Sequence, residues 1–330
     1  MKKLATFQNK FLIQLINRYK RIYLLIFINL IFSIIAKNRK LVPQNKIIIK
    51  INGTGTQNIL YEEFEYPPSQ ILINGYPGVI EEGNTINNLE LIENNITMIW
   101  DEKLQDCTDM FSELTNLTEV DLSNFDTSEV VSMHNMFFDC INLKSINLNN
   151  IVTSSLQNLG STFYSCQSLL FLDLSSFNTS LVTNIASIFF NCESLTSIIL
   201  GNFDTSNVEL MSFSFFFCSS LKSIDLSNFN TSLVTNMNYM FAGCSSLKTI
   251  NIANFNTTKV SFMDGFFSSC INLEYINMSN FIEGDSITIT NITNMFYDVP
   301  NNLTYCVQNS ENIPLIKEEL RDKNYKNKKK

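Results

Sequence analysis

A cysteine recurs at a constant interval through most of this chain of 330 residues. Its six periodic members are Cys140, Cys166, Cys192, Cys218, Cys244 and Cys270, each 26 residues from the next. A constant period of this length is typical of repeat proteins, in which one supersecondary unit stacks on the next. The period therefore predicts a solenoid, because a single repeat is too short to enclose a core of its own.

Other residue types keep fixed distances from the periodic cysteine. A phenylalanine stands three residues before each cysteine position, and a leucine stands three residues after it. In one repeat, Leu221, Ile224 and Leu226 have the spacing of a leucine-rich-repeat strand. Their alternation indicates a short strand with one buried face.

The second half of the repeat has a helical period instead. Its apolar residues are Val234, Met237, Met240, Phe241 and Cys244. Spacings of three and four residues are typical of one face of a helix. Thr231 stands where a side-chain oxygen could cap the first turn. Each repeat is therefore predicted to contain a strand, a turn and a short helix.

The motif that combines these features is L-x-S-I-D-L-S-N-F-N-T-S-x-V-x-x-M-x-x-M-F-x-x-C-x-S. It resembles the BspA-type leucine-rich repeat of bacterial and protist surface proteins, with DUF285-like repeats of 26 residues. The resemblance covers about residues 101–308. It implies an α/β solenoid: a right-handed leucine-rich-repeat stack with a parallel sheet on one face, short helices on the other, and a small β-rich cap before it. Several members of that family are adhesins, so the resemblance also implies binding at a cell surface, without specifying a ligand.

The N-terminal segment, residues 1–46, is basic and contains one long apolar run. It holds ten Lys or Arg and no acidic residue, and its apolar run is Ile22–Ala36. That run is short for a membrane-spanning helix and suits the core of a signal peptide cleaved after Ala36. Lys37 and Arg39 favour a retained signal-anchor instead, and a buried core segment is a third alternative. Under the first two alternatives the repeats are secreted or lie at the cell surface, with membrane anchoring through this run.

Residues 47–100 interrupt the period and are predicted to form a β-rich N-terminal cap. Strands are expected at Ile47–Ile51, Asn58–Tyr61 and Gln70–Asn74, with glycine and proline turn signals between them. A cap is needed because an open solenoid end exposes apolar edges. Trp100 is expected to close the junction with the first repeat.

Composition sets limits on the remaining segments and on the class of partner. The repeats run over residues 101–308, and the polar, basic segment 309–330 is predicted to be a disordered tail. Residues 101–300 contain 20 Asp or Glu and five Lys, a net charge of about −15. Nucleic-acid binding is not expected, because phosphate contacts need Lys and Arg. The charge favours basic partners, or is only a solvated acidic surface.

The eight cysteines are predicted to be buried free thiols. Leu114 and Val299 occupy the cysteine position in the first and last repeats, and a free cysteine behaves as a small apolar side chain. Cys107 and Cys306 fall at apolar positions near opposite ends of the stack, Cys306 aligning with Ile224, so they are too far apart to pair. Disulfides between neighbouring repeats are the alternative. The chain lacks Cys-x-x-Cys and Cys/His clusters, so neither a metal site nor a cofactor is expected.

Catalysis has little support in the sequence. His134 is the single histidine, and it falls in the half of the repeat that is predicted to be helical. A Ser-His-Asp or Cys-His arrangement would have to use it, and the chain has no G-x-S-x-G motif. The acidic residues follow the repeat rather than a cleft. We therefore expect no catalytic residues and no enzymatic activity.

The outward positions of the strands form the predicted binding face. One column holds Glu119, Ser145, Phe171, Ser197, Ser223, Thr249 and Tyr275, and its neighbour holds Asp121, Asn147, Asp173, Ile199, Asp225, Asn251 and Asn277. Both columns point away from the core because side chains alternate across a strand. Phe171, Ile199 and Tyr275 have no evident structural duty, although single exposed apolar residues are common in proteins. The outward residues of the predicted helices are mostly small and polar.

Two rows of asparagine have separate expectations. The row at the bend after each strand is Asn124, Asn150, Asn202, Asn228, Asn254 and Asn280, and it is expected to bond to the backbone of neighbouring turns. Asn178, Asn230 and Asn256 begin N-T-S or N-T-T sequons. They are possible glycosylation sites if the source is a eukaryote.

Two function classes follow from these patterns. The first is a non-enzymatic binding protein, adhesin-like or receptor-like, that recognises an extracellular protein or glycan with the strand face of the solenoid. The second is a structural or self-associating surface coat protein that has no discrete ligand.

Overall fold

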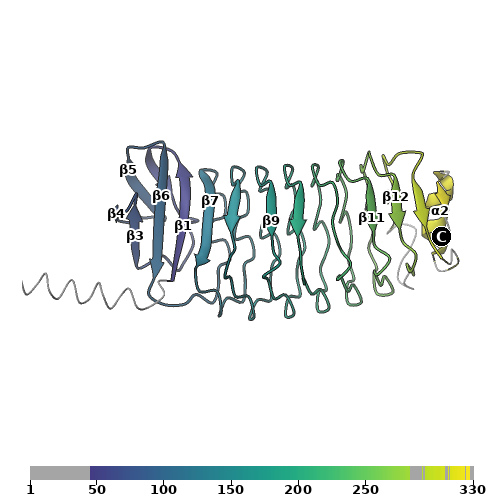
Figure 1. Ribbon diagram of the computed structural model, residues 1–330, viewed down its shortest axis with the longest axis horizontal. Helices are drawn as coiled ribbons and strands as arrows, with labels where there is room; N and C mark the ends of the chain where they lie inside the picture. The colour runs from purple at the N-terminus through teal and green to yellow at the C-terminus, as the bar shows by residue number, and fades with distance from the viewer. Residues whose placement is uncertain are drawn as a thin grey trace, which may run out of the picture. The chain divides into compact units, whose positions relative to one another are not determined.

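The computed structural model describes residues 45–282, 292, 294–308, 311, 313–323 and 325–327. The unit from Asn45 to Lys330 is a β-solenoid of about seven turns. Each turn of the solenoid contains one repeat and is called here a rung. Figure 1 shows the rungs following one another in chain order. The apolar run Ile22–Ala36, with the predictions of a signal or an anchor, lies outside the described residues. Among the residues that are described, none of the helices has the length and apolarity to cross a membrane.

One mixed sheet joins the N-terminal strands to the first repeats. Its strands, in spatial order, are β4 (Tyr76–Pro77), β3 (Gln70–Ile73), β6 (Glu93–Trp100), β1 (Asn45–Asn52), β7 (Leu117–Asn124) and β8 (Ser145–Asn147). β1 pairs antiparallel with both β6 and β7, whereas β7 pairs parallel with β8. The antiparallel strands thus cover the open edge of the first repeat. Trp100 packs edge-on against Phe125 of that repeat at 5.5 Å, as the sequence predicts.

A second, two-stranded sheet completes the N-terminal region. It pairs β2 (Gly55–Asn58) with β5 (Thr85–Leu89) in antiparallel fashion. The strand expected at Asn58–Tyr61 does not form: β2 ends at Asn58, the first residue of that segment. Ile59 and Leu60 are consecutive and both fully buried, which a strand with one buried face cannot achieve.

The strand half of the repeats forms parallel ladders with a step of one repeat. The remaining strands are β9 (Phe171–Asp173), β10 (Ser197–Ile199), β11 (Thr249–Asn251), β12 (Tyr275–Asn277), β13 (Thr304–Cys306) and β14 (Lys326–Asn327). β9 pairs with β10, and β11 to β14 form one sheet in chain order. Between these sheets, Ser223–Asp225 takes the same place in its rung without being a strand, and Ile224 is only half-buried. The parallel sheet is therefore interrupted at this rung.

The second half of the repeat is not helical, which corrects the prediction of a helix face. Met240 donates its N–H to the Met237 carbonyl, three residues earlier, at 3.3 Å. Phe241 donates instead to Phe266 of the next rung at 3.0 Å. An α-helix would send both bonds to carbonyls four residues earlier. Tyr239, which directly precedes Met240, has a left-handed backbone with φ 53°. The segment is a series of tight turns, called here the turn half, whose alternate N–H groups bond to the next rung.

A second parallel ladder runs along the turn half. It consists of single bridges at one-repeat intervals, through Asp106, Ser132, Asn158, Asn184, Leu210, Asn236 and Phe262. Each three-residue turn brings one apolar side chain back toward the core. The resulting spacing of three and four residues is the same as that of one helical face, so the periodic pattern alone could not separate the two structures.

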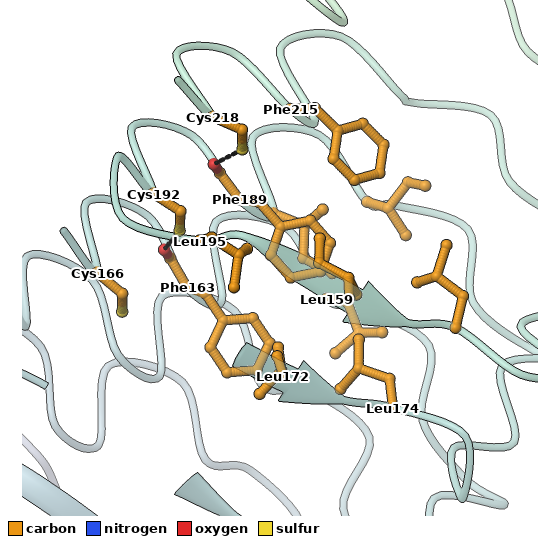
Figure 2. Packing of buried hydrophobic residues seen from close by; sticks show 14 of the residues in the cluster. Leu159, Phe163, Cys166, Leu172, Leu174, Phe189, Cys192, Leu195, Phe215 and Cys218 are labelled. Atoms are coloured by element: carbon orange, nitrogen blue, oxygen red, sulfur yellow. Dashed lines mark hydrogen bonds between the residues drawn. The ribbon is translucent and has the colours of Figure 1, made fainter. Parts of the chain in front are cut away.

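The core is built from columns of identical residues. The phenylalanine column is Phe111, Phe137, Phe163, Phe189, Phe215, Phe241, Phe267 and Phe296. Consecutive rings stack with centroids 5.3–6.0 Å apart, and Figure 2 shows them between the leucine columns. Rings of this column are almost fully buried. Each rung thus supplies one face of a core that only its neighbours can complete.

All eight cysteines are free and buried, as predicted. Each periodic thiol donates to the phenylalanine carbonyl of the preceding rung; the Cys192 thiol lies 3.0 Å from the Phe163 oxygen (Figure 2). Burial raises the pKa of the Cys192 and Cys270 thiols to about 12. The predicted alignment of Cys306 is wrong by one residue, because β13 pairs Cys306 with Asn277 and places Tyr305 in the column of Ile224.

Buried threonines link every rung to the next, and the sequence analysis missed them. The column is Thr127, Thr153, Thr179, Thr205, Thr231 and Thr257. The Thr231 hydroxyl donates to the Asn256 carbonyl at 2.9 Å and accepts the Asn256 N–H at 2.8 Å. The hydroxyl therefore pairs with the next rung as a backbone peptide group would, rather than capping a helix.

The C-terminal segment differs from the expected disordered tail. Its described residues form a helix, α2 (Pro314–Asp322), and the strand β14, which pairs with β13. Ile313, Ile316 and Leu320 are almost fully buried. Their spacing of three and four residues gives the helix one apolar face. A composition-based prediction averages this face with the charged residues around it, and therefore misses it.

Candidate binding face

The predicted outward columns lie side by side on the strand half of the repeats. The β7–β8 register puts Asp121 beside Asn147, and the β9–β10 register puts Asp173 beside Ile199. The β11–β12 register does the same for Asn251 and Asn277. The neighbouring column is formed in the same way, with Glu119, Phe171 and Tyr275 beside Ser145, Ser197 and Thr249. We call these two columns the strand face.

Most acidic and amide side chains of the strand face also shape the backbone. Asp173 Oδ1 accepts the Ser175 N–H at 2.9 Å, and Asp225 Oδ1 accepts the Ser227 N–H at 2.9 Å. Asp121, Asn251 and Asn277 accept the equivalent N–H two residues on. Bonds from the side chain and then the backbone of Ser175 hold the pKa of Asp173 below its usual range, and bonds from the backbone and then the side chain of Ser227 do the same for Asp225. Aspartate and asparagine fill this role equally well, so the fold does not require the charge.

Ile199 departs from this rule. It occupies the same column, is 45% exposed and has no oxygen with which to accept an N–H. Two residues later, Gly201 has a left-handed backbone with φ 56°, and a Cβ there would lie 2.7 Å from the Ser175 Cα. The turn is therefore held by glycine rather than by a side-chain bond. On the neighbouring strand Phe171 is 48% exposed, so β9 and β10 each expose one large apolar side chain.

A shallow hollow adjoins Ile199 where the parallel sheet is interrupted. Its volume is about 320 Å³, and its lining residues are Ile198, Ile199, Leu200, Gly201, Phe203, Asp225, Asn228 and Phe229. Of the predicted residues, the hollow brings together Ile199 and Asp225. An apolar wall beside a carboxylate can hold an apolar group that carries a donor or a positive charge.

The N-terminal end of the strand face is already engaged in internal contacts. Lys50 Nζ lies 2.7 Å from Glu119 Oε1, and Asn147 Nδ2 donates to Asp121 Oδ1 at 3.0 Å. A wider hollow of about 530 Å³ lies over β1, β7 and β8 and includes these residues. Glu119 and Asp121 are thus weaker candidates for a ligand than the residues on β9 and β10.

Tyr275 is less accessible than the sequence predicts. It is half-buried between Thr249 and Thr304 on the flanking strands. Burial, followed by the neighbouring Cys306 thiol, raises the pKa of its phenol. The repeat period places Tyr275 in an outward column, but it does not show how closely the side chains of the flanking strands pack against the ring.

The sequon asparagines are exposed and form turns. Asn178 Oδ1 accepts both the N–H and the hydroxyl of Ser180, at 3.1 and 2.8 Å. Asn256 makes the same two bonds with Thr258, and Asn230 accepts the backbone N–H of Ser232. These bonds use the side-chain oxygen of each asparagine. The row at the bend behaves as expected at three positions, since Asn150, Asn228 and Asn254 donate to backbone carbonyls of the preceding rung.

The turn half carries an aromatic surface that the sequence analysis missed. Phe138, Tyr164, Phe190 and Phe216 are half-buried and stack with centroids 4.3–4.6 Å apart. The prediction of small, polar outward residues is wrong at these rungs. The 26-residue period contains the signal, because these four residues share one column.

The fold defines a class of protein, a β-solenoid built from repeats of 26 residues. Comparison with protein-family models gives one family, DUF285, described as a Mycoplasma protein of unknown function. The model matches residues 83–199, 157–281 and 190–306. Because these matches together span more than half of the sequence, the chain belongs to this family. None of the curated proteins compared with the chain matches it.

Proposed function

We propose that this chain is a non-enzymatic binding protein, secreted or held at a cell surface, that recognises an extracellular protein or glycan with its strand face. One observation carries the proposal. Two neighbouring rungs expose Phe171 and Ile199 at positions where most other rungs have serine, threonine, aspartate or asparagine. At Ile199 the chain also lacks the side-chain oxygen that accepts a backbone N–H two residues later in other rungs.

The physical basis is the concentration of binding energy in a few anchors. Interfaces depend on a small number of large side chains surrounded by polar groups. Phe171 and Ile199 supply such groups on a sheet held rigid by the stacked core, and the hollow beside Ile199 can receive a protruding group of the ligand. Asp173 and Asp225 flank the anchors and favour a ligand with donors or positive charge.

The location outside the cytosol rests on the N-terminal sequence and on the resemblance to BspA-type leucine-rich-repeat surface proteins. The basic, apolar leader up to Ala36 suits export as a signal peptide or retention as an anchor. In this proposal the repeats bind outside the cell, and adhesion is the role that the resemblance favours.

The test begins with an array of extracellular-matrix proteins and glycans probed with the full chain. Substitutions for the anchors come from the repeats themselves: Phe171→Ser, as at Ser145, and Ile199→Asn, as at Asn147. Both variants should fold, because these residues already occupy the same columns. We expect each to weaken binding to an array ligand by about tenfold, which corresponds to ~1.4 kcal/mol.

The matched control is Thr235→Ser, an exposed change in the turn half. Binding that survives both strand-face substitutions and is lost in the control would place recognition elsewhere. A chain that binds nothing on the array, but forms large assemblies as its concentration rises, would favour the alternative of a self-associating coat protein.

A further inference from the structure

Two positions in each turn half require a left-handed backbone. The first is held by Asp109, Asn135, Ser161, Ser187, Phe213, Tyr239, Gly265 and Asn294, and the second by Glu113, Asp139, Ser165, Asn191, Phe217, Gly243, Ser269 and Asp298. Small and polar residues or glycine tolerate this backbone best, whereas bulky residues are strained there. Phe213, Phe217 and Tyr239 therefore break the rule that the other rungs follow, with φ values of 59°, 55° and 53°.

The exceptions gather in adjoining rungs. In the bridge ladder, Leu210 and Phe262 replace the polar residues of most other rungs, and they are 44% and 47% exposed. The aromatic patch is defined here as Leu210, Phe213, Phe216, Phe217, Tyr239 and Phe262. Strained backbone that gathers at one place is more often retained for function than for stability.

The rings of Phe213, Phe216, Phe217 and Tyr239 contact one another and leave part of their surface open. Phe213 stacks on Tyr239 at 5.3 Å, and Phe216 meets the Phe213 ring edge-on at 5.6 Å. Phe217 is 45% exposed. The next rung makes room for these rings, because a Cβ at Gly265 would lie 2.2 Å from Tyr239 Cε1.

A carboxylate contacts the patch at Tyr239. The Tyr239 hydroxyl donates to Asp264 Oδ2 at 2.6 Å. Asp264 Oδ1 is shielded from solvent and has no hydrogen-bond partner. A phenol that donates to a carboxylate has a more electron-rich ring, and the carboxylate adds negative charge beside the hydroxyl. Both effects increase the attraction of the ring for a cation.

We propose that the aromatic patch binds an arginine or lysine side chain of a partner protein. The rings offer apolar contact and attract a cation, Asp264 supplies negative charge, and the acidic repeats favour a basic partner. Between Thr196 and Leu247 the only basic residue in the sequence is Lys222, in the strand half, and Lys259 stands three residues before Phe262 at the last rung of the patch. This surface is distinct from the strand face and does not depend on the function proposed for it.

The test uses two fluorescein-labelled peptides and the full chain. One peptide contains three Arg-Leu-Gly units, and in the other citrulline, a neutral analogue of similar shape, replaces arginine. Fluorescence anisotropy should show that the arginine peptide binds about tenfold more tightly or better, in line with a desolvated cation–π contact. Equal affinity of the two peptides for the unmodified chain would overturn the proposal, whatever the variants show.

Two variants separate the patch from general charge attraction. Phe213→Ser with Tyr239→Asn keeps the net charge and uses residue types found at the same left-handed positions in other rungs. It should abolish the preference for arginine. Glu62→Gln, Glu63→Gln and Glu65→Gln together remove three exposed acidic groups far along the chain, and should leave the preference intact. The reverse pattern would show that the peptide responds only to net charge.

A third variant distinguishes the loss of the aromatic rings from unfolding of the Phe213→Ser, Tyr239→Asn variant. Phe213→Leu with Tyr239→Leu keeps apolar bulk at both positions and removes the aromatic rings. Circular dichroism checks that each variant keeps the spectrum of the unmodified chain. Retention of the arginine preference by the folded leucine variant would refute the role of the rings.

Discussion

Replacing Thr231 with valine removes one buried hydroxyl and leaves the side-chain shape almost unchanged. That hydroxyl makes two bonds with Asn256 of the next rung, at 2.9 and 2.8 Å. A neutral hydrogen bond contributes about 1 kcal/mol net, and a shielded group left without a partner costs a further ~1–3 kcal/mol. We therefore expect Thr231→Val to lower the free energy of unfolding by about 2–4 kcal/mol.

Thr231→Ser is the matched comparison, because it keeps the hydroxyl and removes the methyl group. Its expected cost is about 1 kcal/mol, from one lost apolar group and a small cavity. Urea unfolding followed by circular dichroism measures both variants, with the midpoint as the main observable. A core held only by apolar packing would give the opposite order. If valine is tolerated better than serine, the threonine ladder does not link the rungs as described.

Three further predictions concern the core and the strand face. Phe241→Ala should cost about 3–5 kcal/mol, since its ring is fully buried between two stacked neighbours; a loss below ~1 kcal/mol in chemical denaturation would exclude a stacked column. Native protein at pH 8 should react with a thiol reagent at few of its eight cysteines, because burial raises the pKa of thiols such as Cys192 to about 12. Denatured, unreduced protein should react at nearly all eight, and mass-spectrometric detection of linked rungs such as Cys218–Cys244 would contradict this. Ile199→Asn should raise the free energy of unfolding by roughly 0.5–1 kcal/mol, as other substitutions toward a consensus do, because the amide regains the turn bond; a fall in the urea midpoint would contradict it.

The sequence predicts the columns of the solenoid well, because the repeat period determines which residues stack. Once Cys166 and Cys192 occupy equivalent positions, so do Phe163 and Phe189, and so do the outward residues of β9 and β10. The burial of the phenylalanines, the free state of the cysteines and the pairing of Phe171 with Ser197 all follow from this single register.

Within one repeat, the same pattern fits two local structures. Apolar residues three and four apart indicate a helix when N–H groups bond within the segment. In this chain alternate N–H groups, such as that of Phe241, bond to the next rung, and each turn half contains left-handed residues such as Tyr239. The sequence of a single repeat does not reveal backbone hydrogen bonds between rungs. The apolar spacing therefore favoured the α-helix, which is the commoner structure.

The same limitation explains why the threonine ladder and the aromatic patch were missed. Thr231 reads as a helix cap until its bonds to Asn256 are known. Phe213 and Tyr239 read as ordinary outward residues until their left-handed backbone shows that the position disfavours them. At the C-terminal end, the register was lost across the irregular last repeat, which displaced Cys306 by one position.

The most direct test of strand-face recognition is hydrogen–deuterium exchange of the full chain with and without a ligand identified on the array. The proposal predicts slower exchange in the peptides that cover Phe171–Asp173, Ser197–Ile199 and residues 223–225, with the turn half between residues 210 and 217 unchanged. Slower exchange confined to the turn half, with the strand rungs unaffected, would contradict the assignment of ligand recognition to the strand face.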